Sequence, residues 1–357
     1  MPDSVPASPF LVEKKINTFT ITFVKKVRKN RAMLKILFAP LQGYTTGIYR
    51  KAHAEIFGGV DAYYAPFLRI ENGKPREKDL RDLNELEGNA REIPQIIANS
   101  VDEFKILADA LIAKGYTEID FNMGCPFPMQ VNRHRGAGLL SDEQAVQEIM
   151  DVIRTAPAIV KGTAPVKFSV KMRLGQDSPD EAFALLPILN ETPLSQITLH
   201  PRLGKQQYKG AIDFKSFEKF YAECRHPLVY NGDITSVSQI CEMERRYPKL
   251  AGVMIGRGLL AHPSLAAEYK RLSDINCAAP LNSDTHQDFL GKILQMHQVI
   301  FDHACKTYQG DSQILSHVQS FWEYLEPSIP KKIFKKIKKA GKLSEYQEAI
   351  MEMRGLS

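Results

Sequence analysis

Residues 118–126 read EIDFNMGCP, a short apolar run that ends in asparagine, glycine, cysteine and proline. Stretches with apolar residues at helical spacing flank it, at 101–113 and 142–153. Eight strands alternating with helices predict a (β/α)8 barrel. The rival doubly wound open sheet would need a G-x-G-x-x-G turn after an early strand, and the sequence contains none. The other seven apolar runs that complete the eight are 35–39, 62–65, 95–98, 167–172, 196–200, 228–230 and 252–255.

The pattern changes after Pro280, because residues 284–357 show helical spacing only and no strand-like run. Asparagine, alanine, proline and serine accumulate at 274–283, which is typical of a linker. We therefore expect a barrel domain at 34–275 and a smaller all-helical domain at 284–357. Residues 1–33 are then an N-terminal extension of unknown role, and Met33 is a candidate start of translation.

The composition is that of a globular protein. The 357 residues are 44% hydrophobic and 25% charged, which excludes global disorder. The five cysteines form no C-x-x-C pair and no metal-ligand spacing with the nine histidines, which excludes a disulfide scaffold and predicts no metal site. No run approaches the ~18 apolar residues that a bilayer span requires, and we identify no signal peptide. We expect a monomeric protein of the cytoplasm that binds no membrane.

Basic charge is concentrated near both ends of the chain, and the net charge is +6. Seven lysines and no acid lie between positions 331 and 342, and eight basic residues against one acid lie within 13–35. Such clusters suit an anionic partner such as nucleic acid, although solvated tails are the alternative. The helical spacing of Ile333, Phe334 and Ile337 predicts a buried stripe with lysines on the opposite face. The lysines of this face that we assign to contacts with such an anionic partner are Lys335, Lys336, Lys338 and Lys339.

Barrel enzymes place their sites at the C-terminal ends of the strands. Gln95 and His200 fall there, and Lys171 and Arg173 stand at alternate positions of one strand, so they point the same way. A buried lysine without a partner is costly, so Lys171 should face an electron-rich ligand or an acid such as Asp120. A flavin ring would satisfy Lys171, Gln95 and His200, because its pyrimidine edge offers acceptors and becomes anionic when reduced.

Glycines follow the last two predicted strands. Gly232 and Gly256 would let backbone N–H groups approach a phosphate closely, at the place where this fold usually binds one. Arg257 would add a charge-assisted contact. The alternative is that these glycines only turn the chain.

Cys125 lies between Gly124 and Pro126 at the end of the fourth strand. A thiol has an ordinary pKa near 8.5, so at neutral pH it is mostly protonated and can donate a proton. A lone cysteine is usually a buried small hydrophobe. The position at the barrel mouth, opposite the expected flavin, favours the proton donor.

The chain resembles the tRNA-dihydrouridine synthases from Leu34 to its C-terminus. Each matching segment is short, but their order and spacing along the chain make the signal specific. Position 41 is leucine where the family more often has methionine, and leucine preserves an apolar contact to the ring. The matching segments are APLQG at 39–43, NMGCP at 122–126, RGAG at 135–138, VKMRLG at 170–175, HPR at 200–202, NGD at 231–233 and IGRG at 255–258.

The resemblance implies an FMN-dependent barrel followed by a helical tRNA-binding domain. In the family NADPH reduces FMN, hydride passes from the flavin N5 to C6 of a uracil ring, and a cysteine, here Cys125, gives a proton to C5. Asn122 and Arg173 match the positions that contact uracil. The positions that match FMN contacts are Pro40, Leu41, Gln42, Gln95, Lys171, His200, Asn231, Gly232, Asp233, Gly256 and Arg257.

The target uracil is shielded by stacking in folded RNA, so it must swing into the barrel mouth at a cost of a few kcal/mol. Contacts to the RNA backbone must offset that cost. Two alternatives remain at this stage. One is an FMN barrel reductase or dehydrogenase that acts on a small pyrimidine or enone, and the other is an RNA-binding relative without catalysis.

Overall fold

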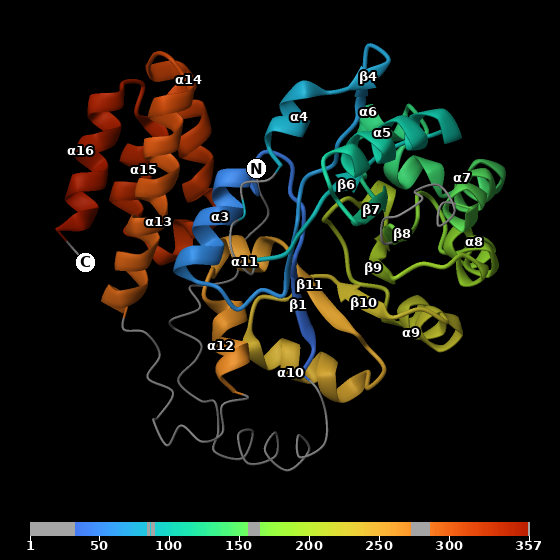
Figure 1. The fold of residues 1–357 in the computed structure, drawn as a ribbon. Helices are drawn as coiled ribbons and strands as arrows, with labels where there is room; N and C mark the ends of the chain where they lie inside the picture. The colour runs from blue at the N-terminus through green and yellow to red at the C-terminus, as the bar shows by residue number, and fades with distance from the viewer. Residues whose placement is uncertain (1–32, 84–85, 87–89, 156–164, 273–285, 356–357) are drawn as a thin grey trace.

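The computed structural model describes residues 33–83, 86, 90–155, 165–272 and 286–355, and its centre is a parallel β-barrel (Figure 1). The strands are hydrogen-bonded in the order β5-β2-β1-β11-β10-β9-β8-β7-β6. Its two end strands, β5 and β6, are consecutive in the chain and are separated only by Pro94, so the sheet closes as an eight-stranded barrel. The strands are β1 (Lys35–Phe38), β2 (Ala62–Tyr64), β5 (Glu92–Ile93), β6 (Gln95–Ile96), β7 (Glu118–Met123), β8 (Lys167–Gly175), β9 (Gln196–Leu203), β10 (Leu228–Asn231) and β11 (Gly252–Ile255).

The predicted barrel is therefore confirmed, and each of the eight apolar runs contributes a strand to it. The third strand is interrupted at Pro94 because proline has no N–H to donate to the ladder. Strands β8 and β9 continue past the ends we predicted and remain paired at Arg173 and His200. The extension of β8 therefore holds Arg173 beside His200 at the mouth of the barrel, just before the register shift between Arg173 and Gly175.

Helices cover the outside of the barrel, and the predicted helices at 101–113 and 142–153 correspond to α5 and α7. The Ser100 side chain caps α5 by accepting from the Glu103 N–H, and α5 buries Phe104 and Leu107 against the sheet. The helical elements up to the end of the barrel are α3 (Gly47–Ile56), α4 (Glu77–Arg81), α5 (Val101–Ala113), α6 (Pro128–Val131), η2 (Gly136–Leu139), α7 (Glu143–Thr155), α8 (Asp180–Glu191), η4 (Gly204–Gln206), α9 (Phe214–Glu223), α10 (Val237–Arg246), α11 (Arg257–Ala261) and α12 (Leu265–Arg271).

A hairpin that we did not predict projects between the second and third barrel strands. Strands β3 (Ile70–Glu71) and β4 (Lys74–Pro75) pair antiparallel around Asn72 and Gly73, both of which have positive φ. Asn-Gly is the preferred pair for such a two-residue turn, so the signal was present in the sequence.

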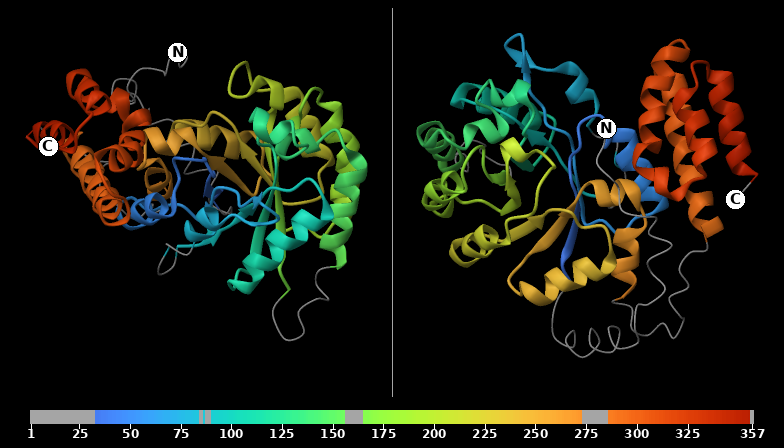
Figure 2. Two further views of the ribbon diagram at one scale, coloured as in Figure 1. Left: turned by 90° about the horizontal axis from the view of Figure 1, so that it is seen from above. Right: turned by 180° about the vertical axis from the view of Figure 1, so that it is seen from behind.

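The C-terminal region is all helical, as predicted, and lies beside the barrel (Figure 2). Helix α13 packs along α3, and η5 packs against α11 at the barrel mouth. In the core of this region the buried Tyr346 hydroxyl lies 2.8 Å from Trp322 Nε1 and 2.7 Å from His297 Nε2. Its elements are α13 (His286–Thr307), α14 (Asp311–Val318), η5 (Gln319–Ser328), α15 (Lys331–Lys339) and α16 (Leu343–Arg354).

Some predicted features lie outside the described residues. These are the N-terminal extension and the basic cluster at 13–35, both as far as residue 32, and the linker at 274–283. No helix in the described part of the chain combines the length and apolar content that crossing a bilayer demands. The described residues also bring together no group of three or more histidine, cysteine, aspartate or glutamate side chains that could hold a metal ion.

Candidate active site

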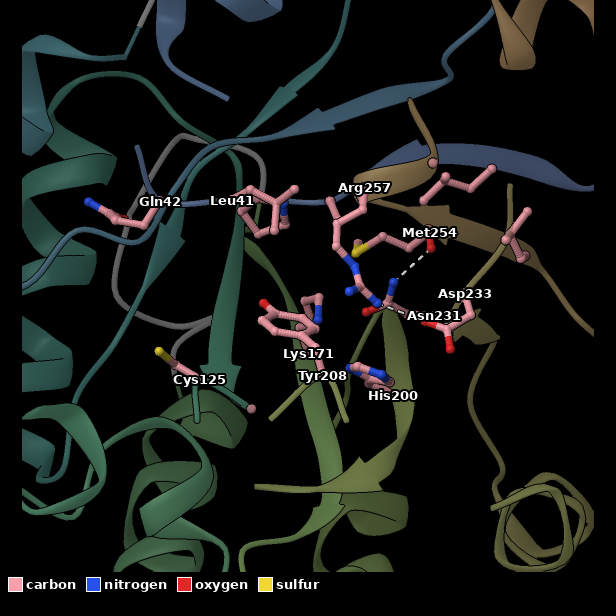
Figure 3. A pocket seen from close by; sticks show the side chains of 18 of the residues that line it. Leu41, Gln42, Cys125, Lys171, His200, Tyr208, Asn231, Asp233, Met254 and Arg257 are labelled. Carbon is pink, nitrogen blue, oxygen red and sulfur yellow. Dashed lines mark hydrogen bonds and ion pairs between the residues drawn. The ribbon is translucent and has the colours of Figure 1, made fainter. Parts of the chain in front are cut away.

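A cavity of about 1130 Å³ opens at the C-terminal ends of the barrel strands (Figure 3). Its lining brings together residues from both ends of the barrel sequence, including every position that we assigned to flavin, uracil or proton donation. The exposed lysines of α15 do not line this cavity. The assigned residues in the lining are Pro40, Leu41, Gln42, Gln95, Asn122, Cys125, Lys171, Arg173, His200, Asn231, Gly232, Asp233, Gly256 and Arg257.

Cys125 stands on a loop that the end of β7 holds in place. The Asn122 side chain accepts hydrogen bonds from the backbone N–H of Gly124 at 3.0 Å and of Cys125 at 2.9 Å. Gly136, with φ of 60°, packs directly behind the cysteine, because a Cβ there would lie 2.8 Å from the Cys125 Cβ. Only glycine fits that backbone and that space, which gives the RGAG segment a structural role.

The Cys125 thiol is set up to carry a proton at neutral pH. Burial raises its pKa above the ordinary value, and this outweighs a backbone hydrogen bond at Phe127 and the charges of Arg173 and Lys171. The thiol is therefore the protonated form in a cavity lined by cations, which is the state that a general acid requires.

Lys171 extends into the cavity without a direct ion pair to any described residue. Among the described residues, none forms a contact ion pair or hydrogen bond with its ammonium group, and Asp120, the partner that we considered, attracts it only at longer range. Burial and the neighbouring Arg173 lower the pKa of Lys171 to about 8, so it is still mostly charged at pH 7. The cation is available for a ligand that offers electron density.

Asp233, which follows β10, forms ion pairs with two arginines. Arg257 Nη2 donates to its Oδ1 at 2.9 Å, and Arg202 binds both carboxylate oxygens. Burial alone would raise the pKa of Asp233, but the hydrogen bonds and charges of Arg202 and Arg257 hold it below its usual value. We did not assign Arg202 from the sequence, although it stands in the HPR segment.

His200 is neutral in this environment. Burial, Arg173, Lys171, Arg202 and Arg257 together hold its pKa well below the ordinary value. The neutral ring lies with its Nε2 3.4 Å from Arg202 Nη1, so this nitrogen accepts and Nδ1 carries the proton.

Tyr208, which the sequence analysis missed, covers this cationic side of the cavity. Its ring lies 4.7 Å from the guanidinium carbon of Arg257 and 5.6 Å from that of Arg173. These are distances at which a ring face attracts a cation. A single tyrosine in a loop carries no periodic signal, so only the packing reveals it.

Apolar side chains at the rim of the cavity are exposed to solvent. Phe127, at the start of α6, is 63% exposed, and Met129, inside α6, is 70% exposed. Across the mouth, Tyr324 of η5 meets Tyr44 at a ring distance of 5.2 Å and lines the same cavity. The helical region therefore contributes directly to the site.

The residues present fit the flavin mononucleotide that the sequence led us to expect. The volume exceeds what a drug-sized ligand requires, so a second ring can enter beside a flavin. Lys171, Arg173 and Arg257 line the cavity together with the Asp233 carboxylate, which also pairs with the buried Arg202. That excess positive charge suits a phosphate and an anionic ring edge.

Comparison with known proteins identifies relatives across most of the chain. A protein named tRNA-dihydrouridine(16) synthase from Neisseria meningitidis serogroup B is 25% identical over 256 residues, 69% of this chain and 74% of its own. A tRNA-dihydrouridine(16) synthase from Pseudomonas syringae is 29% identical over 248 residues, 66% of this chain and 74% of its own. A probable tRNA-dihydrouridine synthase from Helicobacter pylori is 35% identical over 242 residues, 66% of this chain and 69% of its own.

Among solved structures, histamine dehydrogenase from Rhizobium sp. 4-9 matches with a TM-score of 0.50 at 12% identity. The match covers 74% of this chain and 49% of that one, and it shows a shared barrel fold alone. The family model described as Dihydrouridine synthase (Dus) matches residues 37–353, which include nearly all of the barrel and of the helical region. The chain therefore belongs to the dihydrouridine synthase family.

Proposed function

We propose that this protein reduces the C5–C6 double bond of specific uridines in tRNA to give dihydrouridine. The observation that carries the proposal is the juxtaposition of a protonated thiol, Cys125, and an unpaired cation, Lys171, in one cavity that is open to a large substrate. Family membership supports the reaction class.

The cofactor in this proposal is FMN, with NADPH as the reductant. When bound, reduced FMN supplies the hydride that adds to C6 of the uracil ring. Lys171, Gln95 and His200 would hold the ring edge of FMN, and Arg257 with the backbone around Gly232 would hold its phosphate. The remaining positions proposed to contact FMN are Pro40, Leu41, Gln42, Asn231, Asp233 and Gly256.

Cys125 then gives its proton to C5 of the same ring. Asn122 and Arg173 are proposed to contact the uracil, and part of their hydrogen-bonding capacity already fixes the local backbone. Arg173 donates from Nε to the Gly124 carbonyl at 3.1 Å and from Nη1 to the Leu203 carbonyl at 2.9 Å. This bracing supports a uracil contact of fixed geometry beside the thiol.

The helical region is proposed to bind the tRNA. Lys335, Lys336, Lys338 and Lys339 are exposed on α15, and Ile333 and Ile337 are buried on its other face. The division into a barrel domain at 34–275 and a tRNA-binding domain at 284–357 is part of this proposal. Exposed cations on one helix face suit the phosphate backbone, which carries most of the affinity for nucleic acid.

The relatives in Neisseria and Pseudomonas are named for position 16 of tRNA. We therefore propose uridine 16 as the target of this protein too. Mapping dihydrouridine in tRNA from a strain that lacks the gene tests this point, and retention of dihydrouridine at position 16 with loss elsewhere would contradict it.

The reaction is tested with Cys125→Ala. The purified wild-type protein should bind FMN and, with NADPH, add two hydrogens to a uridine of unmodified tRNA, measured by mass spectrometry. Removing the general acid should slow the reaction by about 10²- to 10⁴-fold while FMN remains bound. Cys305→Ala, at an exposed position of α13, is the matched control and should react at the wild-type rate. Undiminished turnover by Cys125→Ala would overturn the proton-donor role.

A further inference from the structure

We propose that Asp120, at the centre of the barrel, is a positioning residue that orients the catalytic cysteine loop through two amide side chains. The inference rests on the proposed function of Cys125 and extends it to a group that makes no contact with the cavity. The carboxylate fixes the direction of the Gln95 amide, that amide fixes Asn122, and Asn122 holds the backbone of Cys125.

The hydrogen-bonded chain Asp120–Gln95–Asn122, called the relay below, begins at a fully buried carboxylate. Asp120 has no exposed surface, and its neighbours Ile119 and Phe121 point outward to the helices while it points into the barrel. Its Oδ2 accepts from Gln95 Nε2 at 2.7 Å, and its Oδ1 accepts from the Ser169 hydroxyl at 2.5 Å. Both oxygens are thus satisfied by neutral donors from the two neighbouring strands, β6 and β8.

The outer end of the relay reaches the thiol loop. Asn122 Nδ2 donates to Gln95 Oε1 at 2.7 Å. The carbonyl oxygen of the same Asn122 amide accepts from the backbone N–H groups of Gly124 and Cys125. Three hydrogen-bonded side chains, Asp120, Gln95 and Asn122, therefore connect the barrel centre to the residue that is proposed to protonate the substrate.

The direction of each amide follows from the chemistry of Asp120. An ionised carboxylate only accepts hydrogen bonds, so Gln95 must turn its NH2 group toward it and its oxygen toward Asn122. Asn122 must then turn its NH2 toward Gln95 and its oxygen toward the loop. Without a hydrogen-bond acceptor at position 120, both amides could rotate together, and the loop N–H groups would lose their acceptor.

The charges around Asp120 leave this polarity in place at neutral pH. Burial raises the pKa of Asp120 to about 6, opposed by the hydrogen bonds from Gln95 and Ser169 and by the charge of Lys171. Among the described residues, the Tyr64 hydroxyl on β2 is another titratable neighbour of Asp120. Its pKa is raised first by burial and also by Asp120, so it stays neutral. Asp120 is thus the acceptor-only end of the relay under working conditions.

The test compares Asp120→Leu with Asp120→Asn in the flavin-loaded full chain. Leucine removes the fixed acceptor, so kcat for tRNA reduction should fall on the order of 10- to 100-fold while the tRNA Kd stays unchanged. Asparagine can still offer its oxygen to Gln95 and its NH2 to Ser169, so it should restore kcat to within about threefold of wild type. Ser169→Ala removes the other hydrogen bond on Asp120 and is the matched control, with near-wild-type kcat expected.

A second measurement reads the loop without turnover. Iodoacetamide alkylation is followed by peptide mass spectrometry, with the exposed Cys305 as internal reference. The ratio of the Cys125 to the Cys305 alkylation rate should change at least about threefold in Asp120→Leu and return to the wild-type value in Asp120→Asn. A merely structural role would lower stability without altering this ratio in the folded protein. If Asp120→Leu does not fold, Asp120→Ala takes its place in both measurements.

Two results would overturn the proposal. One is wild-type kcat and alkylation ratio in Asp120→Leu, and the other is equal damage by Asp120→Asn, which would assign the effect to charge. Because alkylation needs no substrate, it remains readable even if Cys125→Ala keeps full turnover and the proton-donor role itself fails.

Discussion

At the scale of single residues, the buried Lys171 ammonium group lowers the stability of the ligand-free protein and can bind an electron-rich ligand. Its ammonium group lies in the cavity without an ion-pair partner among the described residues, and burial with Arg173 lowers its pKa to about 8. An unpaired, desolvated cation destabilises the protein until a ligand supplies the missing charge. The cavity is thus prepared for an electron-rich ring at the expense of the ligand-free fold.

This leads to a prediction for Lys171→Met. The apoprotein should gain roughly 1–3 kcal/mol of stability at pH 7, because the variant removes a desolvated charge. FMN affinity should fall at least about tenfold, since a hydrogen bond to a charged group contributes about 1.5–3 kcal/mol. Urea unfolding and fluorescence titration measure the two effects.

The pH dependence provides the control for this prediction. The unfolded lysine keeps its proton up to about pH 10.5 and the folded one only to about pH 8, so wild-type stability should rise relative to Lys171→Met between these values. A difference that stays constant across this window would contradict the assigned cause.

Sequence reasoning succeeded at this scale where side chains lie on regular strands. The two-residue period of a strand places Lys171 and Arg173 on one side, and both line the cavity. Arg202 and Tyr208 were missed because their roles depend on pairing with Asp233 and with guanidinium groups across the mouth. No local period predicts a partner on another strand.

At the scale of elements, α15 is an amphipathic helix with a cationic face. Ile333 and Ile337 are buried, and the predicted stripe is therefore present. The lysines on the other face are exposed, and Lys336 also pairs with Glu352 of α16. A surface pair of this kind contributes little to stability, so these lysines can be changed without unfolding the helix.

The prediction for this helix concerns the salt dependence of tRNA binding. Replacing Lys335, Lys336, Lys338 and Lys339 together with glutamine should weaken binding and reduce the slope of log K against log salt by about 0.7–0.9 for each lost phosphate contact. Filter binding over a salt series measures it. The matched control replaces the exposed Lys105, Lys114, Lys215 and Lys249 with glutamine and should leave the slope unchanged. An unaltered slope in the α15 variant would remove this helix from the RNA interface.

Element prediction worked best for long periodic segments. The apolar spacing of 101–113 matches α5 in both bounds, whereas the two-residue strands of the hairpin at 70–75 are too short to carry a period. Phe127 and Met129 lie in the loop and the single turn of α6, where an apolar side chain can equally be buried or exposed. Their exposure at the cavity rim was decided by the packing of the loop.

At the scale of the whole molecule, the barrel and the helical region meet along α3 and α13. Phe289 of α13 is buried there, with its ring 6.4 Å from Phe57 and 6.1 Å from His262. This contact sets where α15 stands relative to the cavity mouth. Under the proposed function, this placement matters because the RNA backbone and the target base would have to be bound at the same time.

We therefore expect Phe289→Ala to separate tRNA binding from FMN binding. Losing the ring should lower the free energy of unfolding by about 3–5 kcal/mol and weaken tRNA binding, while FMN affinity stays unchanged. Phe220→Ala, on the buried face of α9, is the destabilised control and should leave tRNA affinity intact. If Phe289→Ala bound tRNA normally despite its lower stability, this interface would not govern the placement of the RNA.

The sequence by itself determined the barrel, the helical region after it and the strand ends at which the polar side chains stand. These follow from periods of two and of three to four residues, which are properties of adjacent positions. Only the tertiary structure decided which of those side chains bind one another: Asp120 with Gln95, Arg202 with Asp233, and Tyr324 with Tyr44. Such partners come from strands and helices far apart in the chain, and closure of the barrel and the strand register bring them within hydrogen-bonding distance.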